Sequence, residues 1–162
     1  MSAERGVART DAGEGAQERA ERLVAAMLAH DAFTAWLGAE LVALRPDACT
    51  LRMAVRAEML NGFGVCHGGI AFSLADSALA FASNTHGRIT VSIENSIAYP
   101  AAVRGGDTLT ADAELEGESN RLAFYRVTVR NQDGATVALF RGTVYRTNKE
   151  LAAAGETLPT DN

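Results

Sequence analysis

Hydrophobic residues recur with two different periods along this chain, and the period changes from one segment to the next. Near the N-terminus they recur every three to four residues, which predicts an amphipathic helix over residues 17–29. Further along they alternate with polar residues, most clearly over 49–56 and 108–116, which predicts strands with one buried and one solvated face. Asp133-Gly134 is a typical hairpin signal between two such segments. The predicted strands span residues 37–44, 49–56, 89–99, 108–116, 122–130 and 135–146.

Residues 69–83 follow neither pattern, because Ser73, Asp76 and Ser77 are the only polar residues between the first glycine and the final Ser83. A helix with that composition is buried. An antiparallel sheet with one apolar face needs an element to cover it, and no other segment is apolar enough. We therefore predict an α+β fold in which an antiparallel β-sheet wraps around one central buried helix. One sheet covers only one side of such a helix, so we expect a second subunit to cover the rest.

Asp76 is the one charged residue of this helix. A buried carboxylate is unfavourable unless it is paired, hydrogen-bonded or shifted in pKa, and such groups concentrate at functional sites. The alternative is a structural role for Asp76, in which Ser73, Ser77 or a neighbouring backbone group bonds its carboxylate oxygens. However, residues 61–69 contain four glycines, which let backbone N–H groups approach a ligand where the helix begins. This combination favours a functional site.

The composition excludes several classes of protein. The chain has 162 residues, of which 48% are hydrophobic; this suits one domain with a substantial core and does not suit a membrane protein. The formal net charge is -5 and there is no block of Lys or Arg, which argues against nucleic acid or an anionic membrane surface as the main partner. No group of His, Cys, Asp and Glu has the spacing of metal ligands, so we expect no metal.

The two ends of the chain differ from its middle. Residues 1–16 are rich in Gly, Glu and Arg and are expected to be disordered, residues 17–147 to form a single domain, and residues 148–162 to form a loose tail. No secretory signal is visible and the two cysteines have no CxxC spacing, so we expect a cytoplasmic protein with reduced thiols. Cys66 and His67 are an alternative nucleophile pair, although adjacent residues rarely face each other and no third group is evident.

The segment from Asn61 to Asp76, Asn-Gly-Phe-Gly-Val-Cys-His-Gly-Gly-Ile-Ala-Phe-Ser-Leu-Ala-Asp, resembles the signature of the hotdog acyl-CoA thioesterases. Within that superfamily it is most similar to the thioesterase family of phenylacetic-acid degradation, and residues 137–142 resemble that family's last strand. The resemblance covers about residues 23–146. It implies the hotdog fold and hydrolysis of phenylacetyl-CoA or hydroxyphenylacetyl-CoA, with coenzyme A as part of the substrate and no cofactor.

The resemblance also implies roles for five residues. Asp76 is expected to be the catalytic carboxylate, as general base or nucleophile, and the backbone N–H of Gly68 to polarise the thioester carbonyl. Asn61 is expected to position water or substrate, His67 to shape the loop and support Gly68, and Ser77 to contact the water. The chemistry agrees with this, because thioester hydrolysis develops negative charge on the carbonyl oxygen and needs an activated nucleophile.

The spacing of two of these residues has a geometric consequence. Gly68 and Asp76 are eight positions apart on one helix, or about 12 Å along its axis. One carbonyl carbon cannot lie within about 3–3.5 Å of both. We therefore predict a composite site at a dimer interface, with Asn61 and Gly68 from one subunit and Asp76 from the other. We expect the homodimers to pair into a tetramer, a dimer of dimers.

Coenzyme A carries phosphates, so basic residues are expected near the mouth of the site. The candidates are Arg88, Arg121, Arg126 and Arg141, each of which also fits the simpler role of a solvated arginine on a sheet. Two other functions stay open. One is a non-catalytic acyl-CoA sensor, for which no helix-turn-helix signal or spare length is visible. The other is a hotdog hydratase, which uses a His with a carboxylate, but the position of His67 does not match its motifs.

Overall fold

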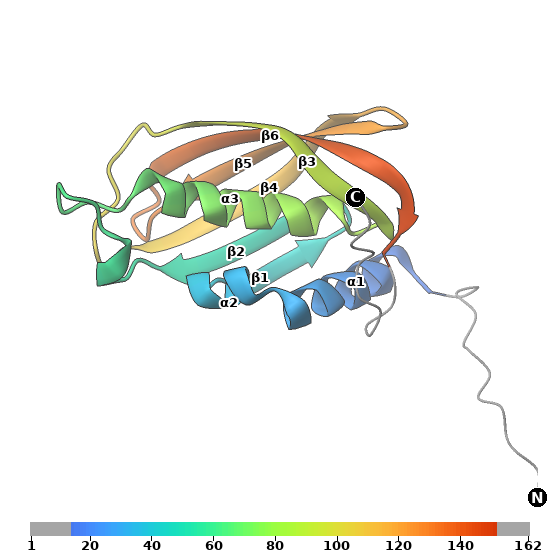
Figure 1. Cartoon of the computed structure of the whole chain (residues 1–162), viewed down its shortest axis with the longest axis horizontal. Helices are drawn as coiled ribbons and strands as arrows, with labels where there is room; N and C mark the ends of the chain where they lie inside the picture. The colour runs from blue at the N-terminus through green and yellow to red at the C-terminus, as the bar shows by residue number, and fades with distance from the viewer. Residues whose placement is uncertain (1–13, 152–162) are drawn as a thin grey trace, which may run out of the picture.

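The structure, a computed structural model, describes residues 14–151 of the chain (Figure 1). In chain order its elements are α1 (Ala16–His30), α2 (Ala32–Leu37), β1 (Glu40–Arg45), β2 (Ala48–Ala54), the short 3-10 helix η1 (Ala57–Met59), α3 (Gly68–Ser83), β3 (Arg88–Ala98), β4 (Thr108–Glu118), β5 (Leu122–Arg130) and β6 (Thr136–Glu150). No helix among the described residues is both long and apolar enough to cross a membrane.

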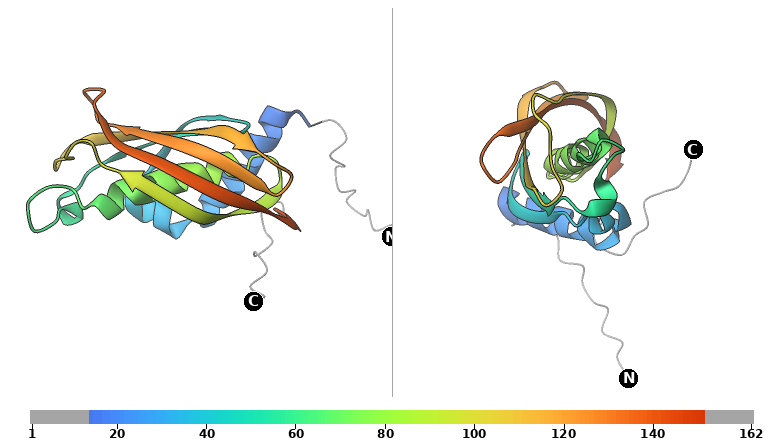
Figure 2. Two further views of the ribbon diagram at one scale, coloured as in Figure 1. Left: turned by 90° about the horizontal axis from the view of Figure 1, so that it is seen from above. Right: turned by 90° about the vertical axis from the view of Figure 1, so that its left-hand side faces the viewer.

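The six strands form one antiparallel sheet in the order β1-β2-β4-β5-β6-β3. The sheet curves around α3, while α1 and α2 lie beside β1 (Figures 1 and 2). Its inner face consists of alternate strand residues that are fully buried, among them Leu51, Leu109, Ala111, Val127 and Val129. The predicted fold is therefore confirmed: an antiparallel sheet wraps around one central helix, which is the hotdog architecture.

The prediction of a strand over 37–44 is wrong at its start, because residues 32–37 form α2. The Asp31 carboxylate accepts a hydrogen bond from the backbone N–H of Thr34 at 2.8 Å, which caps the start of this helix. Gly38 then adopts a left-handed conformation with φ of 75°, which ends the helix. Only the last part of the predicted strand remains, as β1.

The ends of the domain also differ from the predicted ones. β6 continues to Glu150, three residues beyond the predicted end at residue 147, and α1 begins at Ala16, inside the predicted N-terminal tail. Residues 1–13 and 152–162, which make up most of the two predicted tails, lie outside the described residues.

One side of α3 remains open in the single chain. Leu74, Ala75 and Ala78 face the sheet with no exposed surface, whereas Ser73 and Asp76 lie on a half-buried stripe of the same helix. The helix is therefore enclosed less completely than its composition predicts. β3, at the edge of the sheet, also has exposed hydrophobic side chains, since Val91 and Ile93 are 45% and 57% exposed.

Gly142 in β6 lets α3 approach the sheet closely and leaves room for a side chain of the neighbouring strand β3. A Cβ atom at this position would lie 2.5 Å from Cδ2 of Leu79 in α3 and 2.7 Å from Oδ1 of Asn95 in β3. Asn95 and Gly142 are opposite each other in the β3–β6 pair. The missing side chain therefore leaves the space that these two side chains occupy.

We expect Gly142→Ala to lower the free energy of unfolding by about 1–3 kcal/mol, because the added methyl group has no free volume. Urea denaturation at fixed protein concentration measures this change. Gly117→Ala is the matched control in another strand, since a Cβ there meets no atom within 4 Å. Equal midpoints for the two variants would contradict the close approach at Gly142.

Candidate active site

Asp76 lies near the middle of α3 and receives one hydrogen bond from the described part of the chain. Nδ2 of Asn95 donates to its Oδ1 at 3.0 Å. Burial raises the pKa of Asp76 above its ordinary value, and the hydrogen bond from Asn95 offsets part of this rise. Asp76 is therefore a stronger base than an exposed aspartate, and its Oδ2 is left to act on a substrate or a water molecule.

Asn95 is a site residue that the sequence analysis missed. Oγ of Ser92 donates to its Oδ1 at 2.8 Å, which turns its Nδ2 amide toward Asp76. The available signal was an asparagine inside a strand-forming segment, where this residue type is unfavourable. A bulge between Ser92 and Glu94 shifts the alternation of β3, so the pattern of residues could not assign Asn95 to the inner face.

The second group of site atoms lies where α3 begins, next to a loop that projects beyond the sheet (Figure 1). Oδ1 of Asn61 accepts hydrogen bonds from the backbone N–H groups of Phe63, at 2.9 Å, and Val65, at 3.4 Å. Asn61 therefore folds this loop onto itself. Among residues 14–151, no acceptor bonds its Nδ2 amide, which leaves that group as a donor.

His67 caps α3 and leaves the N–H of Gly68 available. Nδ1 of His67 accepts from the N–H of Gly69 at 2.9 Å, and its carbonyl accepts from the N–H of Ile70 at 2.9 Å. None of the described residues accepts a hydrogen bond from the N–H of Gly68. The Gly68 N–H and the His67 carbonyl belong to the same peptide group. Because that carbonyl accepts a hydrogen bond from Ile70, the Gly68 N–H is polarised, and the helix dipole adds partial positive charge. Such a donor suits a developing oxyanion.

A cavity of about 230 Å³ lies beside Gly68. Its walls are mostly small and apolar, so it suits an apolar group of a ligand. The lining residues are Val65, Cys66, His67, Gly68, Ala71, Tyr99, Ala101, Ala102 and Val103.

The geometry does not favour Cys66 and His67 as a nucleophile pair. Sγ of Cys66 lies 3.6 Å from the backbone carbonyl of His67, to which it donates, and the described hydrogen bond of the imidazole goes to Gly69. Burial raises the pKa of the Cys66 thiol, so the reactive thiolate is disfavoured at neutral pH.

Comparison with known proteins agrees with the fold and with the resemblance of residues 61–76 to thioesterases. A family model described as the thioesterase superfamily matches residues 63–138. The acyl-coenzyme A thioesterase PaaI of Escherichia coli K12 is 39% identical over 121 residues, which are 75% of this chain and 86% of that protein. The chain belongs to the thioesterase superfamily. It is thus a thioester hydrolase of the PaaI type, and its resemblance to the family of phenylacetic-acid degradation is confirmed.

Similar solved structures support the same fold. The structure of the E. coli PaaI protein from the phenylacetic acid degradation operon has a TM-score of 0.83 and 35% identity, covering 85% of this chain and all of that one. A Streptococcus mutans protein bound to acetyl CoA has a TM-score of 0.67 and 28% identity, covering 69% of this chain and 90% of that one.

Ser77 in this thioesterase points away from Asp76. Its Oγ lies 3.2 Å from Oγ1 of Thr34 in α2, and Thr34 in turn donates to the Asp31 carboxylate at 2.6 Å. Since the Thr34 proton is directed to Asp31, Ser77 is the donor to Thr34. The geometry of the single chain therefore gives Ser77 a role in joining α2 to α3, and its expected contact with the water stays a prediction.

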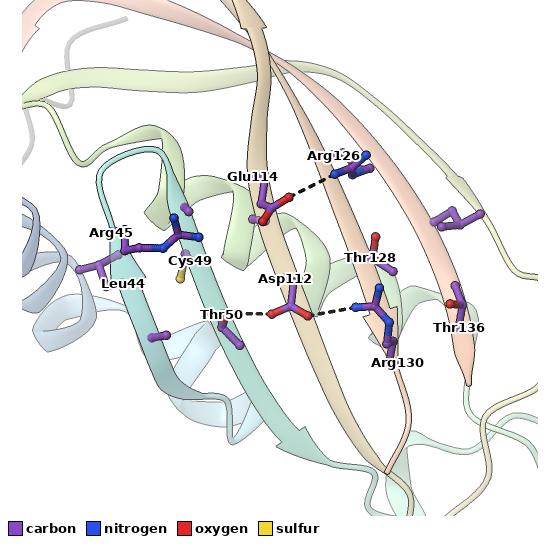
Figure 3. Close-up of a pocket in the computed structure, with 14 residues that line it drawn as sticks. Leu44, Arg45, Cys49, Thr50, Asp112, Glu114, Arg126, Thr128, Arg130 and Thr136 are labelled. Carbon is purple, nitrogen blue, oxygen red and sulfur yellow. Dashed lines mark hydrogen bonds and ion pairs between the residues drawn. The ribbon is translucent and has the colours of Figure 1, made fainter. Parts of the chain in front are cut away.

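Two of the four arginine candidates, Arg126 and Arg141, lie on the face of the sheet opposite to α3. Arg126 is 3.1 Å from Glu114, and Arg141 is 3.5 Å from Glu116. Arg126 also lines a larger cavity of about 600 Å³ on this outer face, shown in Figure 3. These guanidinium groups are already paired with carboxylates of the same chain.

The other two candidates, Arg88 and Arg121, also have partners. Arg88 donates to the backbone carbonyl of Thr147 at 3.0 Å, and Arg121 donates to the hydroxyl of Tyr145 at 3.2 Å. None of the four candidates lines the cavity beside Gly68. Within residues 14–151, no three His, Cys, Asp or Glu side chains gather as a metal site.

The raised pKa of Asp76 predicts how stability changes with pH. The folded state binds the proton of Asp76 more tightly than the unfolded state does. Ionised Asp76 therefore disfavours folding above its raised pKa, and this penalty disappears as the pH falls toward the ordinary pKa of an aspartate. We expect Asp76→Asn to be more stable than the wild type at pH 7, with a difference that narrows toward pH 4.

Urea denaturation across this pH range, at one protein concentration, measures the difference. Asp133→Asn, at an exposed position of the β5–β6 turn, is the control for the loss of one carboxylate. A pH-independent difference for Asp76→Asn would contradict the raised pKa.

Proposed function

We propose that this thioesterase hydrolyses phenylacetyl-CoA and hydroxyphenylacetyl-CoA to the free acid and coenzyme A. The observation that carries the proposal is the pair of groups on α3: a half-buried carboxylate of raised pKa at Asp76, and an N–H at Gly68 that has no acceptor among the described residues. One supplies a base or nucleophile and the other an oxyanion donor, which are the two requirements of acyl transfer to water.

In the proposed reaction, the carbonyl oxygen of the thioester accepts a hydrogen bond from the Gly68 N–H. Asp76 removes a proton from a water molecule as the water oxygen forms a bond to the carbonyl carbon. The negative charge on the oxygen then reforms the C=O bond and expels the coenzyme A thiolate, which takes up a proton. In the nucleophilic route, the Asp76 carboxylate attacks the carbon and expels the coenzyme A thiolate to give a mixed anhydride, and water then hydrolyses this anhydride to the free acid and the Asp76 carboxylate.

Two observations support an arylacetyl substrate. The similar E. coli protein comes from the phenylacetic acid degradation operon. The cavity beside Gly68 is small and is walled by short apolar side chains, with the Tyr99 ring on one side. A compact group with an aromatic ring fits this chemistry better than a long flexible chain.

We propose that the site forms between two subunits, with Asn61 and Gly68 from one and Asp76 from the other. Two features support this arrangement besides the spacing on α3. Phe63, on the loop that Asn61 shapes, is 93% exposed, which is unusual for a large aromatic side chain. The edge strand β3 carries exposed hydrophobic residues next to the stripe that contains Asp76. A second copy of the chain covers both features in the proposed dimer.

Three finer predictions belong to the same proposal. The pairing of dimers into a tetramer, the cytoplasmic location and the assignment of Arg88, Arg121, Arg126 and Arg141 to the coenzyme A phosphates stay predictions. The S. mutans relative is bound to acetyl CoA, so we propose acyl-CoA as the form of substrate here. The alternatives of a non-catalytic acyl-CoA-binding protein and of a hydratase are outcomes of the assay below.

We expect the purified protein to release free thiol from phenylacetyl-CoA and hydroxyphenylacetyl-CoA faster than from benzoyl-CoA or straight-chain acyl-CoAs. Asp76→Asn should lower kcat by roughly 10²–10⁴-fold, because it removes the base or nucleophile while it keeps the shape of the side chain. Thiol release followed with a chromogenic disulfide, with product analysis by mass spectrometry, measures both. Binding without thiol release would indicate a sensor, and a changed acyl chain a hydratase.

Mixed dimers test the composite site. Gly68→Pro removes the N–H at the first helical position, where proline is tolerated, and Asp76→Asn removes the carboxylate. If each site takes one group from each subunit, a mixed dimer contains one intact site, and co-expression should restore roughly a quarter of the wild-type activity. Co-expression of Asp76→Asn with Asp76→Ala is the control and should restore none. If Gly68→Pro and Asp76→Asn also restore none, the composite site is wrong.

A further inference from the structure

Tyr99, the residue after β3, lies directly against Gly68. Its hydroxyl donates a hydrogen bond to the backbone carbonyl of Gly68 at 2.9 Å. A Cβ atom on Gly68 would lie 3.1 Å from both Cζ and the hydroxyl oxygen of Tyr99, so a side chain at position 68 would require the ring to shift by a few tenths of an ångström. The glycine is held by the phenol through both packing and a hydrogen bond.

Tyr99 is also the largest side chain in the wall of the cavity beside Gly68. The residues around it are short, among them Ala71, Ala101 and Ala102. Tyr99 is still 48% exposed, so the protein core does not account for the position of its ring. The hydrogen bond to Gly68 is the contact that holds its hydroxyl in place.

We propose that Tyr99 positions the Gly68 N–H and limits the size of the acyl group that enters the cavity. This inference rests on the proposed function, in which that N–H binds the thioester carbonyl. The two roles belong to different parts of the side chain: the hydroxyl fixes the glycine, and the ring closes the cavity.

The two roles predict different kinetic effects. A donor that must be placed at a developing oxyanion affects the transition state more than substrate binding, so loss of its support should lower kcat and leave KM nearly unchanged. A ring that limits cavity size acts on the choice between acyl groups. A residue that served only to hold the fold together would lower stability without changing either quantity.

The test compares Tyr99→Phe and Tyr99→Ala with the wild type on phenylacetyl-CoA and octanoyl-CoA. Tyr99→Phe keeps the ring, so we expect kcat to fall about tenfold, the effect of one lost hydrogen bond, with KM and acyl preference unchanged. Tyr99→Ala opens the cavity, so we expect the ratio of kcat/KM for phenylacetyl-CoA over octanoyl-CoA to fall by about tenfold or more.

Tyr125→Phe is the matched control, because the Tyr125 hydroxyl donates to Asp47, also at 2.9 Å, in the turn between β1 and β2. It should lower the urea midpoint and leave kcat and the acyl ratio unchanged. Wild-type kcat in Tyr99→Phe would overturn the positioning role, and a wild-type acyl ratio in Tyr99→Ala would overturn the selectivity role, while the proposed function stands in both cases. Absence of thiol release from the wild type would overturn the proposed function itself.

Discussion

The close approach of α3 to the curved sheet is the constraint on which the rest of this molecule depends. The sheet wraps closely around the helix where Ala75 and Ala78 face it and where β6 has no side chain at Gly142. The same gap lets the Asn95 carboxamide pass between strand and helix to the Asp76 carboxylate. One glycine therefore sets both the packing of the core and the environment of the only charged residue on the helix.

That environment balances two opposing effects on Asp76. Burial raises its pKa, which makes it a better base but favours the protonated form that cannot act as one. The Asn95 amide lowers the pKa in part, and Ser92 holds that amide in the required orientation. A cationic partner would lower the pKa much further and weaken the base. A neutral donor keeps the carboxylate both ionisable and basic.

The fold could be predicted from the sequence, and Asp76 could be singled out as a candidate, for identifiable reasons. Strand alternation and the apolar stretch over 69–83 are strong periodic signals, and Asp76 stood out as the one charge within that stretch. α2 was missed because six residues are too few to show a helical period. Asn95 was missed because a bulge in β3 breaks the alternation that would have placed it on the inner face. Tyr99 gave no signal, because its contact with Gly68 joins residues 31 positions apart. The partner of Ser77 could not be predicted either, because Thr34 belongs to the helix that was missed.

The position of β3 has a consequence for how this protein can change during evolution. The strand is one of the two edges of the sheet, and it also supplies Asn95, held by Ser92, to the carboxylate of α3. Its outward-facing residues contact a neighbouring subunit or solvent, whereas Asn95 lowers the pKa of Asp76. A substitution selected for one property alters the backbone on which the other depends, so this strand can diverge only slowly. Ala101 and Ala102, which follow the strand and line the cavity beside Gly68, carry no such double duty, and they are the positions where paralogues can acquire new acyl preferences without losing their chemistry.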